Sequence, residues 1–160
     1  MDDGIFLSKP GYVLDPLKMF KMEYCKACST PFQYGVKLSK DYDSPKVDAT
    51  LYRQLVGSLI YLTHSKPDIS FPVSVVSRIM QDPRESHWKD AKRIVRYIKS
   101  TYKFGIKYGR STNNLVNFTN FDRDGDANDQ NSTFGYVFRW SIGPMIWSCK
   151  KTNAIYMLKK

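Results

Sequence analysis

Three aspartates at alternate positions are the first group of side chains that could do chemistry. Asp122, Asp124 and Asp126 occupy a turn-rich stretch, with Gly125 between the last two. Carboxylates at this spacing occur in calcium loops, but an EF-hand needs a glycine at its position six and a glutamate at position twelve. Counting from any of the three aspartates meets neither requirement. The spacing therefore predicts no metal site.

The second group is the pair Cys25 and Cys28, whose CxxC spacing is used in zinc sites. Such a site needs a second pair of ligands, and Cys149, His64 and His87 do not provide one at a suitable spacing. We interpret both histidines as surface or packing residues. Three cysteines are too few for a disulfide framework, so a reducing compartment is the default.

The composition is that of a chain that folds. Apolar residues make up 42% of the 160 positions and aromatic residues 14%, which is enough to build a core. The net charge of +10 favours polyanionic partners such as nucleic acid. No stretch approaches the roughly 20 apolar residues of a membrane span, and the N-terminus does not resemble a signal peptide. We expect no membrane partner and a location in the cytoplasm or nucleus.

Helical periodicity predicts a helical body over residues 12–103. The first helix should begin near Asp15, because Pro16 inside it would cost about 3 kcal/mol. Asp48 and Thr50 can cap the next helix, and a third should begin around Ser70. The second helix should bury one stripe, formed by Leu51, Leu55, Val56, Leu59, Ile60 and Leu62. A fourth, over residues 85–101, should bury Trp88, Ala91, Val95 and Ile98.

Alternating apolar and polar residues predict strands in the rest of the chain. A short strand opens the sequence at 5–8, and the period changes from helix to strand after Gly105. The stretches GYVFRWS and GPMIWSCKK predict two strands separated by a Gly-Pro turn. The fold class expected is α+β, with a helical body followed by a three-stranded antiparallel sheet.

Four ordered segments resemble a known family. IFLSKPGYVLDPLKMFKMEYCKACSTP, LYRQLVGSLIYLTHSKPDISF, HWKDAKRIVRYIKSTYKFGIKY and NSTFGYVF…WSCKK follow the order seen in copia-type retrotransposon Pol polyproteins. The resemblance implies that residues 1–110 form a reverse transcriptase thumb- and connection-like region. It also implies that residues 111–160 form a truncated ribonuclease H-like sheet.

The same resemblance implies a degenerate metal site. The family pattern YTDSDWAGD stands here as FTNFDRDGD, so Asn120 replaces the first aspartate ligand while Asp122 matches the second. A neutral amide cannot supply the anionic oxygen that two-metal hydrolysis needs. The family's polymerase aspartate pair and its later ribonuclease H glutamate also have no counterpart. We expect no catalytic residues, no metal, no cofactor and no enzyme activity.

A basic stripe on the fourth helix is the candidate polyanion contact. Its five cations are Lys89, Lys92, Arg93, Arg96 and Lys99. They could bind phosphates without reading sequence, as weak non-specific nucleic acid binding, or they could form a solvated helix face.

Three functional classes follow from these residues and the resemblance. Copia-like chains of this kind are also found among secreted RxLR effectors of oomycetes, which implies a non-enzymatic binder of a host or cellular protein that dampens host cell death. Such an effector would be secreted into the host cytoplasm or nucleus. The alternatives are a residual nucleic-acid-binding module and an unselected pseudogene product. We also expect self-association through an uncovered sheet face formed by Phe118, Val137, Phe138, Ile146 and Trp147.

Overall fold

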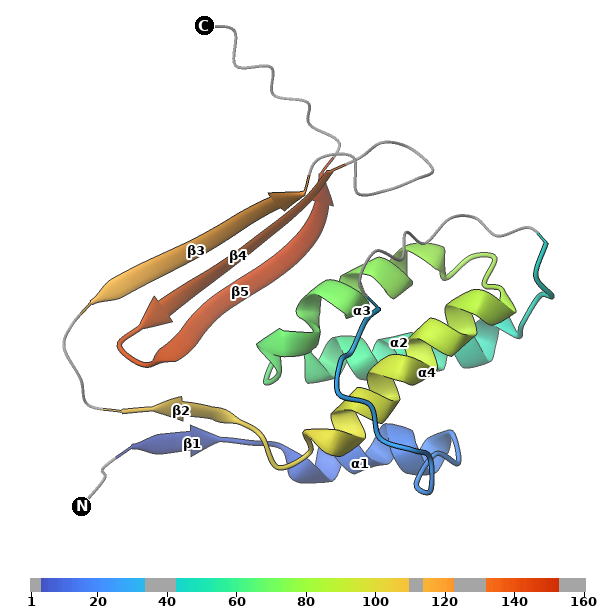
Figure 1. The fold of residues 1–160 in the computed structure, drawn as a ribbon, viewed down its shortest axis with the longest axis horizontal. Coiled ribbons are helices and arrows are strands. Elements are labelled where there is room, and N and C mark those ends of the chain that lie inside the picture. The colour runs from blue at the N-terminus through green and yellow to red at the C-terminus, as the bar shows by residue number, and fades with distance from the viewer. Residues whose placement is uncertain (1–3, 34–42, 110–113, 123–131, 153–160) are drawn as a thin grey trace, which may run out of the picture.

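The chain folds into a helical body and two antiparallel sheets, which gives it a mixed α and β architecture (Figure 1). The computed structural model describes residues 4–33, 43–109, 114–122 and 132–152. The α+β prediction is confirmed at this level. In chain order the elements are β1 (Ile5–Leu7), α1 (Pro10–Met19), α2 (Ala49–Leu62), the short turn η1 (Pro67–Ile69), α3 (Ser70–Val76), the short turn η2 (Ser77–Ile79), α4 (Glu85–Ser100), β2 (Ile106–Tyr108), β3 (Leu115–Asp122), β4 (Ser132–Trp140) and β5 (Gly143–Thr152).

Helix α1 begins at Pro10, so the prediction of a start near Asp15 was wrong. Proline suits the first helical position, because its ring fixes φ and its missing N–H needs no partner there. Pro16 then lies inside the helix and removes one main-chain hydrogen bond. Burial of Val13 and Leu17, both 2% exposed, offsets that loss.

Helix α2 begins with the predicted cap. The Asp48 carboxylate accepts hydrogen bonds from the main-chain N–H groups of Thr50, at 2.7 Å, and Leu51, at 3.3 Å. These bonds satisfy donors that a helix start leaves without an intrahelical partner. The cap therefore fixes where α2 starts.

The buried stripe of α2 differs from the prediction at both edges. Leu51 and Ile60 are 47% and 39% exposed, whereas Tyr52 is completely buried. The Tyr52 hydroxyl donates to the carbonyl of Val76 at 2.9 Å, which ties α2 to the end of α3. Tyr52 can be buried because its polar end has this partner. The predicted stripe residues that do lie in the core are Leu55, Val56, Leu59 and Leu62.

Helices α3 and α4 begin close to where the sequence predicts. The α3 helix starts at Ser70, so Pro72 falls in its first turn, where a missing N–H has little cost. In α4 the residues Ala91, Val95 and Ile98 are buried as expected, and Trp88 is partly buried against the same core. The helices of the body thus share one hydrophobic core.

The N-terminal strand pairs with β2 in a separate two-stranded sheet. Ile5 lies opposite Tyr108 and Leu7 lies opposite Ile106, so the strand after Gly105 joins β1 rather than the larger sheet. The three-stranded antiparallel sheet has the order β3-β4-β5, which confirms the predicted strand number. Its last turn is Ser141–Ile142, with Ser141 at φ 55°, and not the Gly-Pro turn that was predicted.

The apolar residues predicted to form one uncovered face lie on both faces of this sheet. Phe118 is opposite Val137 and Val137 is opposite Trp147, so these three side chains share a face. Phe138 is opposite Ile146, on the other face. Phe118 is 55% and Ile146 56% exposed, so each face carries exposed apolar surface.

Strand β5 is the strand of this sheet that lies beside the helical body, and β3 lies farthest from it (Figure 1). Side-chain hydrogen bonds join this sheet to the helical body. The Trp147 indole N–H donates to the carbonyl of Thr63 at 2.8 Å, and Arg78 donates to the Thr133 hydroxyl at 2.9 Å. Over the described ranges, no helix is long and apolar enough to cross a membrane.

Candidate functional site

Asn120 lies on β3 with its side chain exposed, opposite Gly135 of β4. Asp122 ends the same strand opposite Thr133, and two residues along a strand place both on one face of the sheet. The side chain of Asp122, and all of Asp124 and Asp126, lie outside the described residues. Asn120 itself offers a neutral amide to solvent, which brings no negative charge to that face.

The histidines and cysteines have structural contacts. His87 is 1% exposed, and its Nδ1 accepts from the main-chain N–H of Arg84 at the start of α4. His64 is exposed, with Nδ1 2.9 Å from the carbonyl oxygen of Tyr61. Cys25, Cys28 and Cys149 are free thiols. Across the parts of the chain that the structure describes, no three His, Cys, Asp or Glu residues are grouped to hold a metal ion.

The first two cations of the basic stripe lie near the start of α4. Lys89 forms an ion pair with Glu85 at 3.3 Å, and its side chain is 68% exposed. The Lys92 ammonium group lies 5.6 Å from the centre of the Trp88 ring. These contacts are weak in water, so both charges stay available to a second partner.

The other three cations hold a neighbouring segment in place. Arg96 donates to the carbonyl of Lys26 at 2.6 Å, and Lys99 donates to the carbonyls of Glu23 and Cys25 at 2.6 and 2.7 Å. Arg93 donates to the Thr30 hydroxyl at 2.9 Å. The main-chain N–H of Cys28 also donates to the main-chain carbonyl of Arg96 at 3.2 Å. We call residues 23–30 the strap, because this segment lies along α4 on these hydrogen bonds.

The five predicted polyanion contacts therefore do not act as one free surface. Arg96 and Lys99 already donate hydrogen bonds to carbonyls of the strap. Lys89 and Lys92 make only surface contacts. Charge periodicity along α4 cannot separate these two roles, since the strap is distant in sequence.

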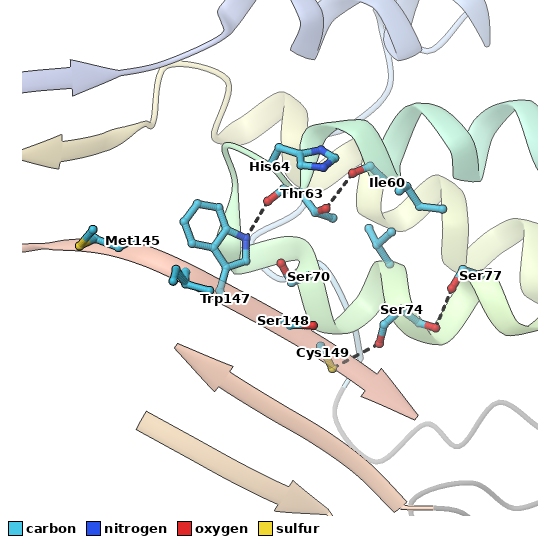
Figure 2. A pocket seen from close by; sticks show the side chains of 12 residues that line it. Ile60, Thr63, His64, Ser70, Ser74, Ser77, Met145, Trp147, Ser148 and Cys149 are labelled. Atoms are coloured by element: carbon cyan, nitrogen blue, oxygen red, sulfur yellow. Dashed lines mark hydrogen bonds between the residues drawn. The ribbon is translucent and has the colours of Figure 1, made fainter. Parts of the chain in front are cut away.

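A cleft of about 520 Å³ lies between β5 and the helices α2 and α3 (Figure 2). No sequence pattern considered above predicted this cleft. The available signal was the spacing of Ser70, Ser74 and Ser77, which places three hydroxyl groups on one face of α3 and its continuation. The lining comprises Ile60, Thr63, His64, Ser70, Val73, Ser74, Ser77, Met145, Ile146, Trp147, Ser148 and Cys149.

The helical body and the three-stranded antiparallel sheet together span the part of the chain that is similar to known proteins. Over nearly its whole length, the chain is homologous to a segment of the retrovirus-related Pol polyproteins of copia-type retrotransposons. It is 38% identical over 154 residues to the Pol polyprotein from transposon RE1 of Arabidopsis thaliana, a match that covers 95% of this chain and 10% of that protein. It is 34% identical to the Pol polyprotein from transposon TNT 1-94 of Nicotiana tabacum, over 94% of this chain and 12% of that protein.

A shorter relative covers less of the chain but more of its own length. Secreted RxLR effector protein 161 of Plasmopara viticola is 35% identical over 106 residues, which is 65% of this chain and 75% of the effector. The chain thus spans about a tenth of the Pol polyproteins but overlaps three quarters of this small protein. No protein-family model and no solved structure matches the chain.

Proposed function

We propose that the chain is a non-enzymatic, Pol-derived binding protein that acts inside cells on a protein partner. The observation that carries the proposal is that residue 120 is an exposed asparagine on β3. The resemblance to the family implies that this position corresponds to the family's first metal-binding aspartate. Without that charge, two divalent ions about 4 Å apart repel each other with too few anionic oxygens between them. The chain uses its surfaces for binding and not for hydrolysis.

The finer parts of the proposal rest on the family. Residues 1–110 correspond to a thumb- and connection-like region, and residues 111–160 to a truncated ribonuclease H-like sheet. The similarity to a protein named as a secreted RxLR effector supports a role as an effector. We propose further that this effector reaches the cytoplasm or nucleus of a host cell and suppresses cell death there. The protein partner is then a component of the host cell.

Hybrid cleavage tests the absence of catalysis. The purified chain is incubated with an RNA–DNA hybrid and Mg²⁺ or Mn²⁺, beside an active ribonuclease H. We expect no cleavage, and none from Asn120→Asp, because one restored carboxylate does not complete a two-metal site. Cleavage that disappears on addition of EDTA would overturn the proposal.

Transient expression in leaf cells together with a cell-death elicitor tests the effector role. We expect less cell death with the chain than with an unrelated protein of similar size and charge. Equal cell death at equal protein levels would remove the effector role and leave only a binding protein.

A residual nucleic-acid-binding module is the second candidate. The observation in its favour is that Lys89 and Lys92 remain available for phosphate contact at the start of α4. Two such cations support only weak binding that depends steeply on salt and not on sequence.

A further inference from the structure

The outer edge of β3 is open. Strand β4 lies on one side of β3, and no strand in the described ranges lies on its other side (Figure 1). The eight residues of β3 pair with β4 in an unbroken register, so alternate main-chain N–H and carbonyl groups along β3 point away from the sheet. An edge of this kind presents donors and acceptors to another extended strand.

The edge of β3 lacks the features that usually prevent strand pairing. Residues 115–121 include no charged residue and no proline, and their register with β4 has no bulge. The described side chains of β3 are exposed apart from the half-buried Val116, and Phe118 is 55% exposed. Proteins protect a free edge with lysine, proline, a bulge or a covering helix. Because β3 has none of these in the described residues, it is suited to pair with a further strand.

The opposite edge of the same sheet, along β5, is closed. Helix α3 packs against it, where the Ser74 hydroxyl lies 3.3 Å from the sulfur of Cys149. Trp147 of β5 donates to the carbonyl of Thr63 at the end of α2, and β2 lies against the start of β5. A sheet with one open edge can pair with one other copy, and the pairing then closes instead of growing into a fibre.

We propose that two copies of the chain pair through β3, antiparallel about a two-fold axis, and form one continuous sheet. A second copy fits this edge because the strand complements itself. When Phe118 lies opposite Phe118 of the partner subunit, the two rings form an aromatic pair on one face of the sheet. In the same register Asn117 lies opposite Thr119, which places polar side chains together. Val116 lies opposite Asn120, so no like charges face each other.

The charge of the chain restricts where two copies can meet. Each copy carries a net charge of +10, so two copies repel each other, and the uncharged β3 edge is where that repulsion costs least. Arg139 lies beside this edge, with its guanidinium carbon 5.7 Å from the centre of the Phe118 ring. Added salt should therefore strengthen the pairing by screening the repulsion, whereas salt weakens the binding of a polyanion. Contact through one strand is small, so the dimer should depend on concentration.

Sedimentation velocity of the full chain over a micromolar concentration series tests the pairing, and hydrogen exchange locates it. We expect a monomer–dimer equilibrium in which the dimer fraction rises with concentration and with added salt. Where the dimer dominates, every second amide of β3 should exchange about tenfold more slowly or less, because it gains a main-chain acceptor, while β5 stays unchanged. A monomer at all concentrations, species that grow beyond the dimer, or a dimer without protection in β3 would overturn the proposal.

Two variants of equal charge test the edge itself. Thr119→Lys places a lysine on the open edge, whereas Tyr24→Lys adds the same charge at a residue that is 98% exposed and lies outside the sheet. We expect Thr119→Lys to raise the Kd of the dimer about tenfold or more, and Tyr24→Lys to change it less than about twofold. Equal effects would contradict pairing through β3. If Thr119→Lys does not fold, the exchange pattern of the unsubstituted chain still decides the question.

Photo-cross-linking tests the register. With p-benzoylphenylalanine in place of Phe118, we expect a cross-linked dimer whose joined peptides both come from residues 115–122. The same replacement at Phe104, which is 65% exposed, should give no cross-linked dimer. A cross-link from position 118 to the helical body or to β5 of the second copy would show contact between sheet faces and would overturn edge pairing. This inference does not rest on the proposed function, since cleavage of an RNA–DNA hybrid would overturn that function and leave these measurements unchanged.

Discussion

Some polar side chains buried in the helical body connect one element to another. Lys66 is 4% exposed and donates to the carbonyl of Thr101 at 2.7 Å, which joins the end of α2 to the end of α4. Burial lowers the pKa of Lys66, an effect that the charge of Asp68 opposes. Burying the Lys66 ammonium group costs desolvation, but its hydrogen bonds to Thr101 hold the two helix ends together.

Tyr97 gives the stability of the fold a defined dependence on alkaline pH. Burial and the hydrogen bond to Asp68, at 2.8 Å, raise the pKa of Tyr97 from 10.0 to about 12. Because the folded pKa lies above the unfolded value, the stabilisation is complete below pH 10 and is lost as the pH rises through about 12. We expect Tyr97→Phe to lower the free energy of unfolding by about 1 kcal/mol near neutral pH. Urea unfolding over a pH series should show this difference shrinking in that window, and a constant or growing difference would be inconsistent.

Tyr52 ties α2 to α3 through its hydroxyl. Tyr52→Phe keeps the ring but leaves the carbonyl of Val76 without its donor, so we expect a loss of about 1–2 kcal/mol in the free energy of unfolding. The control is Tyr24→Phe, since Tyr24 is 98% exposed. Urea denaturation measures both, and a Tyr52→Phe variant as stable as the Tyr24→Phe variant would show that the hydrogen bond contributes nothing net.

At the scale of elements, α4 makes core contacts with its apolar residues and strap contacts with two of its cations. Its apolar side contributes Ala91, Ile94 and Val95 to the core, and Arg96 and Lys99 bind the strap on another side. The aliphatic stems of such side chains also cover apolar surface. Replacing them therefore disturbs local structure as well as charge.

Salt dependence distinguishes the two groups of cations on α4. If the chain binds duplex, Lys89→Gln with Lys92→Gln should flatten the log–log salt slope by about 1.8, which corresponds to two phosphate contacts. Arg96→Gln with Lys99→Gln should instead speed hydrogen exchange in the strap, because it removes hydrogen bonds to the carbonyls there. A parent chain that binds no duplex at low salt would end the basic-stripe hypothesis. An unchanged slope in the first double variant would move the contact elsewhere.

Local patterns predicted the elements well and their partners poorly. Asp48 as a cap, Ser70 as a helix start and the buried side of α4 all follow from spacing within one segment. The pairing of β1 with β2 joins residues about a hundred positions apart, which no local period contains. The distribution of Phe118 and Ile146 over two faces follows from register, and the cleft follows from how β5 meets α3. Asn120 was found through the family pattern, and its exposure came only from the fold.

At the scale of the whole molecule, the buried apolar residues lie mainly in the helical body, whereas the three-stranded sheet exposes apolar side chains. Every residue of the main hydrophobic core lies between Val13 and Ile98, within the helical body and the residues next to it. The sheet adds exposed apolar side chains on both faces, including Phe118 and Ile146. Exposed apolar surface of this kind favours association.

We therefore expect the purified chain to bind a hydrophobic dye or to form oligomers. Because the two faces are separate, Phe118→Ser and Ile146→Ser should each lower dye fluorescence in part, and the double variant should lower it further. Light scattering after gel filtration gives the oligomeric state. A monodisperse monomer that does not increase the fluorescence of the dye would show that both faces are covered in solution.

The sheet should also open separately from the helical body. None of the sheet residues whose burial is described belongs to the main core, and the Trp147 indole donates a hydrogen bond to that body. Native-state hydrogen exchange should therefore show lower protection in β4 and β5 than in α2 and α4. Trp147→Phe removes the indole donor and should speed exchange in β5 while α4 stays unchanged. Trp88→Phe is the control, because Trp88 packs on Phe20 with ring centres 5.8 Å apart and should loosen the body instead. If Trp147→Phe lowers protection in α4 as much as in β5, the two parts open as one unit, and a boundary near residue 110 is wrong.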